Sequence, residues 1–226
     1  MVDIQANRET IAILGGTGDL GTGLAMRWSK AGYKIVIGSR TLEKARNAVA
    51  NLQLISPETP ADAMVNADAA AAGDIVVLTV PAEHQLATLG GVKTALTGKI
   101  LIDVTVPLVP PKVGTVQLPR EGSAGKRAQD LLGEDVMVVT AFQNIAAHLL
   151  QQDVHIECDV LVAGNKKVAR DKVIQLAEEA GMTAWHAGPV ENSAAAEALT
   201  SILIQINRRH DISHSGIKIV GQADHS

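Results

Sequence analysis

A short glycine-rich segment near the N-terminus has the residue types and the spacing of an anion-binding loop. The segment reads Gly16, Thr17, Gly18, Asp19, Leu20, Gly21, which is the pattern G-x-G-x-x-G. In such a loop the first glycine permits a tight turn and the second lets a pyrophosphate approach the backbone. The third glycine lets the following helix pack closely on the preceding strand. The free N–H groups and the dipole at the start of that helix favour an anion.

The elements expected around this loop give the pattern its meaning, because the pattern alone is weak. The apolar run 11–14 is typical of a buried strand, and an amphipathic helix is expected over 18–31. A second apolar strand is expected over 34–38. Strand, glycine loop, helix and second strand together predict a dinucleotide-binding βαβ unit.

The residues after the second strand predict which dinucleotide binds. A site for NAD usually has Asp or Glu there, bonded to the ribose hydroxyls. This chain has Ser39 and Arg40 instead, and no acidic residue before Glu43. A serine hydroxyl and an arginine fork suit a phosphate, and Lys44 lies one helical turn after Arg40. We interpret Ser39, Arg40 and Lys44 as a clamp for the 2′-phosphate of NADP(H); a solvated basic helix start is the alternative.

Further strands and helices alternate along the rest of the chain. Helices are expected over 41–52 (with Thr41 as N-cap), 61–73, 83–96, 124–132, 165–181 and 191–210. Strands are expected over 74–80, 99–106, 136–140, 160–164, 182–188 and 216–221. The stretch 107–125 is rich in proline and glycine and is expected to be a long loop.

This alternation predicts an α/β protein with a Rossmann-type doubly wound parallel sheet. We place an NADP-binding Rossmann domain over 1–143 and a small C-terminal α/β domain over 144–226. The apolar helix around 194–206 is expected to be buried on several sides, partly in the core and partly in a contact between two copies that also walls the cofactor cleft.

Composition narrows the class of protein further. The chain has 226 residues, 46% of them apolar, a formal net charge of −4 and a single cysteine. It lacks the basic character of nucleic-acid-binding or membrane-surface proteins, and it has no apolar stretch long enough for a membrane span. The N-terminal residues do not resemble a signal peptide, so we expect a cytoplasmic protein that binds neither nucleic acid nor membrane.

Acid–base machinery is scarce in this sequence. The seven histidines show no metal-ligand spacing with carboxylates, so no metal site is expected, and no residue is assigned a catalytic role. Tyr33 is the only tyrosine. It precedes the second strand, so we expect it at the edge of the sheet away from the strand ends that would bind the cofactor. A hydride transfer between two bound cofactors needs no proton donor, because proximity and orientation supply most of the acceleration.

Taken together, the motifs resemble one known family, the F420H2:NADP oxidoreductases, which exchange hydride between NADP(H) and the deazaflavin coenzyme F420. The resemblance extends over nearly the whole chain. The segments that carry it are ILGGTGDLGTGLA, GSRTLEKA, LTVPAEH, VPLVPP, AFQNIAAHLL, HAGPVENS and EALTSILIQINRRHDISHSGIKIVG.

The resemblance implies a homodimer in which deazaflavin and nicotinamide stack in a cleft between the domains. By position, NADP would contact Thr17, Gly18, Asp19, Leu20, Ser39, Arg40 and Lys44. Val80 and Pro81 would flank the nicotinamide. The deazaflavin site would be lined by Gln143, Ile145, Ala147 and the stretch 215–217, including Ile217. Some members carry a histidine where this chain has Gln143; glutamine can hydrogen-bond a ring carbonyl but cannot become cationic.

Two other functions fit the sequence. An NADPH-dependent enzyme could reduce an ordinary flavin or a metal ion with the same Rossmann domain. A regulatory module could bind NADP(H) without turnover, which the scarcity of acid–base residues allows.

Overall fold

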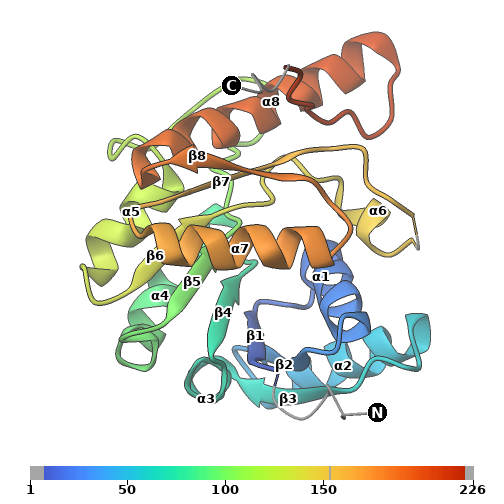
Figure 1. The fold of residues 1–226 in the computed structure, drawn as a ribbon, viewed down its shortest axis with the longest axis vertical. Helices are drawn as coiled ribbons and strands as arrows, with labels where there is room; N and C mark the ends of the chain where they lie inside the picture. The colour runs from blue at the N-terminus through green and yellow to red at the C-terminus, as the bar shows by residue number, and fades with distance from the viewer. Residues whose placement is uncertain (1–7, 153, 222–226) are drawn as a thin grey trace, which may run out of the picture.

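A computed structural model describes residues 8–152 and 154–221, and its centre is one eight-stranded sheet of order β3-β2-β1-β4-β5-β6-β7-β8 (Figure 1). The strands are β1 (Thr10–Leu14), β2 (Lys34–Ser39), β3 (Ala61–Val65), β4 (Ile75–Leu78), β5 (Ile100–Asp103), β6 (Met137–Thr140), β7 (Val160–Gly164) and β8 (Ala184–Gly188). All neighbouring strands are parallel except β6 and β7. The Rossmann-type α/β prediction is confirmed.

Helices cover both faces of this sheet. The helices are α1 (Asp19–Lys30), α2 (Leu42–Ile55), α3 (Asn66–Ala72), α4 (Gln85–Val92), α5 (Ala124–Leu132), α6 (Ala147–Leu150), α7 (Lys167–Glu179) and α8 (Ser193–His210), with short 3₁₀ turns η1 (Ala82–His84), η2 (Lys93–Leu96) and η3 (Val190–Asn192). Helices α1, α2 and α7 bury apolar side chains in one core cluster, whereas α3, α4 and α5 contribute to a second. Two separate clusters are the expected result of a parallel sheet that is buried on both faces.

The carboxyl ends of five strands meet along one edge of the sheet. In the parallel register Leu14 pairs with both Gly38 and Leu78, Leu78 pairs with Asp103, and Asp103 pairs with Thr140. These five residues form a row across β2, β1, β4, β5 and β6. The loops that leave this row therefore lie side by side, which is where open α/β sheets bind their ligands.

One predicted helix is wrong in its first part. The alanine-rich stretch 61–73 was expected to be helical throughout, but Ala61–Val65 forms β3 and only Asn66–Ala72 forms α3. Strand β3 lies at the edge of the sheet and pairs in parallel with β2, from Ile35 opposite Ala61 onward. This pairing outweighs the helix propensity of alanine, which is a weak local preference.

The predicted last strand over 216–221 does not form. The segment runs instead along the start of β7, where the Asp159 N–H donates to the Ile217 carbonyl at 2.8 Å. The Ile219 N–H donates to Asp159 Oδ2 at 2.8 Å. Because a side-chain carboxylate takes one of the positions that a neighbouring backbone carbonyl would fill, the contact does not continue as a ladder.

The C-terminal half continues the sheet through the antiparallel strand β7, and α8 lies along one end of the molecule (Figure 1). The division at 143/144 stays a prediction. Helix α8 buries Ser193, Ala196 and Leu203, but Ile202 and Ile206 are 45% and 36% exposed in the single chain. Ile202 and Ile206 thus form an apolar side of α8 that the described residues leave partly exposed.

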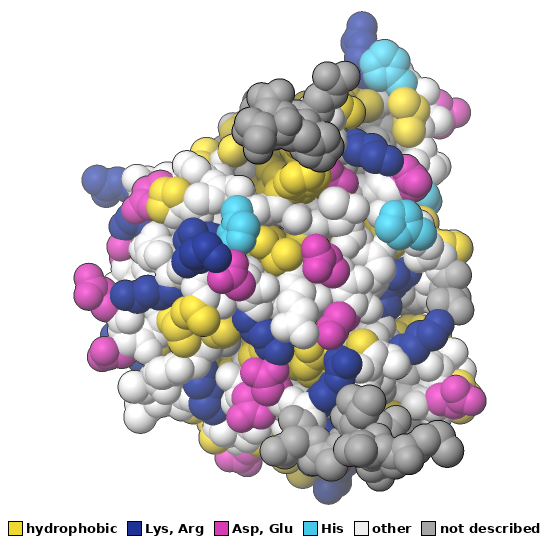
Figure 2. Space-filling view, viewed as in Figure 1, with side chains coloured by type: hydrophobic (Ala, Val, Ile, Leu, Met, Phe, Trp, Pro, Cys, Tyr) yellow, Lys and Arg dark blue, Asp and Glu magenta, His cyan; other side chains and the backbone are white. Residues whose placement is uncertain are grey.

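Two observations concern the surface. In the described residues, no helix is both long enough and apolar enough to cross a membrane. On the face shown in Figure 2, Lys and Arg side chains are interspersed with Asp and Glu rather than gathered in one basic patch.

Candidate functional site

The glycine loop joins β1 to α1 at the edge where the strand ends meet. Its turn begins at Gly15, whose φ of +74° lies in the left-handed region. A Cβ on Gly15 would also lie 2.4 Å from Val80 Cγ1. The conformational demand of the tight turn therefore falls on Gly15 rather than on Gly16, the residue to which the sequence pattern assigned it.

The three glycines of the pattern occupy different surroundings. A Cβ on Gly16 would lie 3.2 Å from the Ile13 carbonyl oxygen, and one on Gly21 would lie 2.7 Å from Gly16 Cα. A Cβ on Gly18 would meet no atom within 4 Å. Gly16 and Gly21 thus serve the packing of helix on strand, whereas Gly18 leaves open space beside the first turn of α1, where a ligand phosphate can approach the backbone.

The residues predicted to clamp the 2′-phosphate surround the start of α2. Ser39 ends β2 and is buried, whereas Arg40 and Lys44 are exposed. Thr41 is the N-cap of α2, as predicted, because its hydroxyl accepts a hydrogen bond from the Lys44 N–H at 3.4 Å. Both cations are therefore available to an anion in solvent beside β2, and the clamp remains a prediction.

Val80 and Pro81 follow β4 directly beside the glycine loop. Val80 is partly buried and contacts Gly15, and Pro81 is exposed. The Thr79 N–H and hydroxyl both donate to the Leu14 carbonyl, at 2.9 and 3.1 Å. These bonds hold the loop after β4 against the loop after β1 and so place Val80 beside the glycine loop; the contact of Val80 and Pro81 with the nicotinamide stays a prediction.

A buried polar network lies at the ends of β5 and β6. The Asp103 carboxylate accepts hydrogen bonds from the Thr105 N–H at 2.9 Å and from Gln85 Nε2. Gln85 Oε1 in turn accepts two hydrogen bonds from Arg127, at 2.9 and 2.6 Å. Burial raises the pKa of the Asp103 carboxyl, and these donors and the Arg127 charge oppose that rise. Gln143 Nε2 donates to the Asp103 carbonyl at 3.1 Å.

The residues predicted to line the deazaflavin site lie in three places. Ile145 belongs to the core cluster that includes α1 and α7, and Ile217 packs against the same cluster. Gln143 joins the polar network at β5. Ala147 begins α6, and its carbonyl oxygen lies 3.4 Å from where a Cβ on Gly23 would be, so Ala147 lies against α1.

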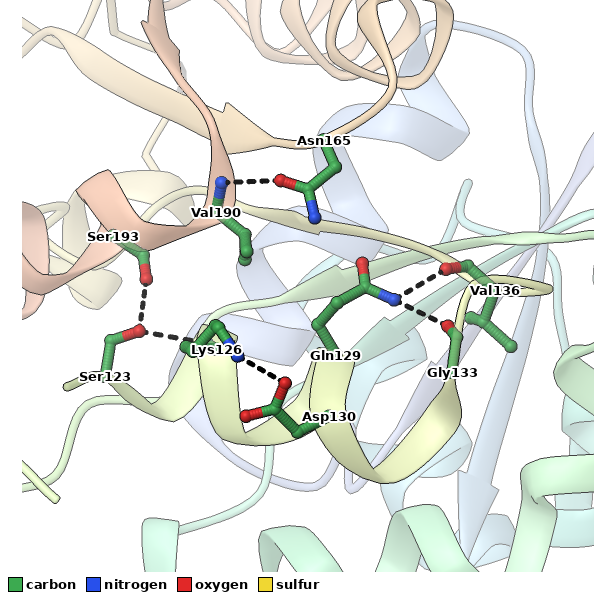
Figure 3. A network of polar contacts seen from close by, with 9 residues as sticks. All are labelled: Ser123, Lys126, Gln129, Asp130, Gly133, Val136, Asn165, Val190 and Ser193. Atoms are coloured by element: carbon green, nitrogen blue, oxygen red, sulfur yellow. Dashed lines mark hydrogen bonds and ion pairs between the residues drawn. The ribbon is translucent and has the colours of Figure 1, made fainter. Parts of the chain in front are cut away.

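Helix α8 is fixed to the Rossmann core through α5. Glu197, only 1% exposed, accepts hydrogen bonds from the N–H groups of Ala124 and Gly125 at 2.7 and 3.0 Å. Burial raises the pKa of the Glu197 carboxyl to about 7. Figure 3 shows a further link, in which the Ser193 hydroxyl donates to Ser123 Oγ at 2.7 Å.

The far end of α5 is fixed to the sheet. Gln129 Nε2 donates to the carbonyls of Gly133 and Val136 at 2.6 and 3.1 Å (Figure 3). Helix α5 therefore connects α8 to β6, the strand that Gln143 follows by three residues.

Sequence reasoning missed Asp103, Thr105, Gln85, Arg127 and Glu197. Two features of the sequence pointed to them: Asp103 ends an apolar strand, and Glu197 lies inside an apolar helix. Among the described residues, no group of three or more His, Cys, Asp or Glu side chains could hold a metal ion.

Comparison with known proteins shows the family of this chain. The family described as "NADP oxidoreductase coenzyme F420-dependent" matches residues 10–107. The F420-dependent NADP reductase of Methanocaldococcus jannaschii is 40% identical over 218 residues, covering 92% of this chain and 97% of the relative. That of Methanothermobacter thermautotrophicus is 39% identical, covering 92% and 94%.

The chain belongs to the F420-dependent NADP oxidoreductase family. This confirms the resemblance identified from its motifs. Among solved structures, a hypothetical protein from Sinorhizobium meliloti superposes with a TM-score of 0.70 at 21% identity, covering 83% of this chain and 88% of the other. That likeness concerns the fold alone.

Proposed function

We propose that this chain transfers hydride between NADP(H) and the deazaflavin coenzyme F420. The observation that carries the proposal is the juxtaposition at the sheet edge. An open glycine loop for a dinucleotide lies beside Val80, and the segment with Gln143 and Ile145 follows the end of β6 in the same row of strand ends. Membership in the family supports the identity of both cofactors.

In this proposal NADP(H) lies across the first half of the sheet. The backbone from Gly16 to Gly21, with Thr17, Gly18, Asp19 and Leu20, binds the pyrophosphate at the start of α1. The 2′-phosphate is bound by Ser39, Arg40 and Lys44. Val80 and Pro81 contact the nicotinamide, whose position over β4 and β5 follows from the usual direction of a dinucleotide across the switch point between β1 and β4.

The deazaflavin then lies on the nicotinamide, in contact with Gln143, Ile145, Ala147 and Ile217. Aliphatic side chains can support a planar ring, and only 2% of the residues in this chain are aromatic. The chemistry supplied by the two coenzymes is a hydride transfer between a nicotinamide carbon and a deazaflavin carbon. The residues of the chain position the two rings and exclude water, and no side chain has to carry a proton.

Two structural proposals accompany this function. The C-terminal part, 144–226, acts as a second domain that carries α8 and the Ile217 segment over the cleft. Two copies of the chain associate through the uncovered side of α8, where Ile202 and Ile206 lie one helical turn apart. The link from Glu197 to α5 then fixes the cleft wall and the dimer contact together.

The activity is tested by mixing the purified protein with NADPH and a panel of acceptors, and by following the loss of nicotinamide absorbance. We expect turnover with the oxidised deazaflavin and far slower reaction with FAD, FMN or a ferric chelate. Faster turnover with an ordinary flavin or with ferric iron would contradict the proposal in favour of a different reductase. Tight NADPH binding without any hydride transfer would indicate a sensing module.

A further inference from the structure

One side of helix α1 contacts α6 and the residues that follow α6. Asp19, Gly23 and Arg27 are spaced four residues apart, so they lie in a row along the same side of α1. At Asp19 the contact is slight, because Gln151 Nε2 donates to the Asp19 carbonyl at 3.5 Å. At Gly23 and Arg27 it is close, and Figure 1 shows α6 next to α1. This row joins the helix that follows the glycine loop to α6, the first helix of the C-terminal part.

Gly23 allows the backbone of α6 to approach α1 closely. A Cβ on Gly23 would lie 2.4 Å from Leu150 Cβ and 3.4 Å from the Ala147 carbonyl oxygen. Leu150 is 1% exposed and belongs to the core cluster, so it cannot move aside without disturbing its neighbours. Glycine is otherwise unfavourable inside a helix. The close approach of α6 explains why this position of α1 is a glycine.

Arg27 binds backbone carbonyls at the ends of two helices. Its Nε donates to the Leu150 carbonyl at 2.9 Å, and its Nη1 donates to the carbonyl of Ala180, the C-cap of α7, at 2.6 Å. Its Nη2 donates at 3.2, 2.7 and 2.9 Å to the carbonyls of Leu149, Gln152 and Val154. Carbonyls at the end of a helix have no partner within that helix. The planar guanidinium holds five N–H groups in a fixed arrangement, which a lysine ammonium cannot reproduce.

Helix α1 is held in place without these contacts, whereas α6 depends on them. Leu24, Ala25 and Trp28 of α1 are fully buried, and Trp28 Nε1 donates to the Leu176 carbonyl of α7 at 2.9 Å. Helix α6 is a single turn of four residues, and α1 is its main neighbour among the described helices and strands. A change at Gly23 or Arg27 should therefore displace α6 and leave the glycine loop in place.

We propose that Gly23 and Arg27 are positioning residues that set the place of the deazaflavin relative to NADP(H). The start of α1 binds the pyrophosphate in the proposed function, and α6 begins with Ala147, which contacts the deazaflavin there. One rigid helix thus fixes both coenzymes. Gly23 and Arg27 act through the backbone of α6 and touch neither coenzyme themselves. The inference rests on the proposed function, in which the rate depends on the relative position of the two rings.

The test compares wild type with Gly23→Ala and Arg27→Lys. Calorimetry measures the dissociation constants of NADPH and of the oxidised deazaflavin, and stopped flow measures the rate of one hydride transfer with both coenzymes saturating. In both variants we expect the dissociation constant of the deazaflavin to rise roughly tenfold and that of NADPH to stay within about twofold. The rate of hydride transfer should fall roughly 10- to 100-fold. A role in stability alone would not separate the two affinities.

Two control variants match these substitutions. Gly91→Ala also changes a helical glycine, but in α4, where a Cβ would meet no atom within 4 Å. Arg46→Lys changes an exposed arginine of α2. Both controls should keep the wild-type affinities and rate.

Other results would overturn the inference. If wild type transfers hydride and the variants match it in affinity and rate, the positioning role is wrong and the proposed function stands. Equal losses of affinity for both coenzymes would also contradict the role. No hydride transfer by wild type would defeat both proposals. Should Gly23→Ala and Arg27→Lys fail to fold, Gln151→Ala removes only the contact at Asp19 and should weaken deazaflavin binding alone, about twofold.

Discussion

At the residue scale, different glycines of the loop serve ligand binding and folding. Gly18 has open space where a Cβ would be, whereas Gly21 touches Gly16 and Gly15 touches Val80. The sequence pattern predicted all three glycines of the motif, but it could not predict that the left-handed turn falls on Gly15. That assignment depends on the backbone angle and on a contact with a residue 65 positions later.

The first prediction concerns these glycines. Gly18→Ala should leave the free energy of unfolding nearly unchanged but weaken NADPH binding at least tenfold, because the new methyl group occupies the path of the pyrophosphate. Gly21→Ala should destabilise the fold by about 1–3 kcal/mol, because its Cβ would meet Gly16 Cα at 2.7 Å. Urea unfolding and NADPH titration measure the two effects. Equal losses of stability in both variants would refute this division of roles.

The second prediction concerns the choice of dinucleotide. Arg40→Ala should weaken NADPH binding roughly 10- to 100-fold, because a charge-assisted bond to the 2′-phosphate contributes about 1.5–3 kcal/mol. NADH binding should change little. Arg46→Ala, at an exposed arginine further along α2, is the control and should affect neither ligand. A parallel loss for NADPH and NADH would show that Arg40 does not contact the 2′-phosphate.

The polar network at Asp103 shows where sequence reasoning ends. Gln85, Asp103 and Arg127 are far apart in the chain and become partners only when β5, α4 and α5 meet. No spacing rule connects them. The glycine loop, in contrast, is a contiguous segment whose spacing is itself the geometric requirement.

At the element scale, most strands and helices follow from local apolar periodicity. Helix α5 and strand β7 have the predicted bounds. Gly181 follows the end of α7 with a φ of +82°, as expected for a C′ glycine. The failures have a common cause. Strand β3 and the 216–221 segment are decided by partners distant in sequence, namely β2 and Asp159.

The third prediction concerns the joint between α8 and α5. Glu197 has a pKa near 7 in the folded protein, against 4.5 as its ordinary value. The folded state therefore holds a proton that the unfolded state releases, and this contribution to stability is lost as the pH rises from about 4.5 to about 7. The loss amounts to about 3 kcal/mol at most.

Glu197→Gln removes this titration. Between pH 5 and pH 8, wild type should lose up to about 3 kcal/mol of unfolding free energy relative to Glu197→Gln. Urea unfolding at both pH values measures it, and titrations common to the two proteins cancel. A difference that stays constant with pH would mean that Glu197 does not titrate in this range.

At the scale of the whole molecule, the uncovered side of α8 is the basis for the fourth prediction. Wild type should have twice the chain mass of 23.6 kDa by light scattering. Ile202→Arg with Ile206→Arg should yield the single-chain mass, because two desolvated cations oppose burial of that side. Leu54→Arg, at an exposed leucine on α2, is the control and should stay dimeric. A monomeric wild type would contradict the proposed contact.

The whole-molecule account places two rings face to face and assigns no proton transfer to a side chain. Its central claim is direct hydride transfer, and an isotope measurement tests that claim. NADPH deuterated at C4 on the transferred side is mixed with oxidised deazaflavin in ordinary water, and the reduced product is analysed by mass spectrometry. The account predicts that the deuterium is retained at a carbon of the deazaflavin. Loss of the label to solvent, or no transfer at all, would contradict it.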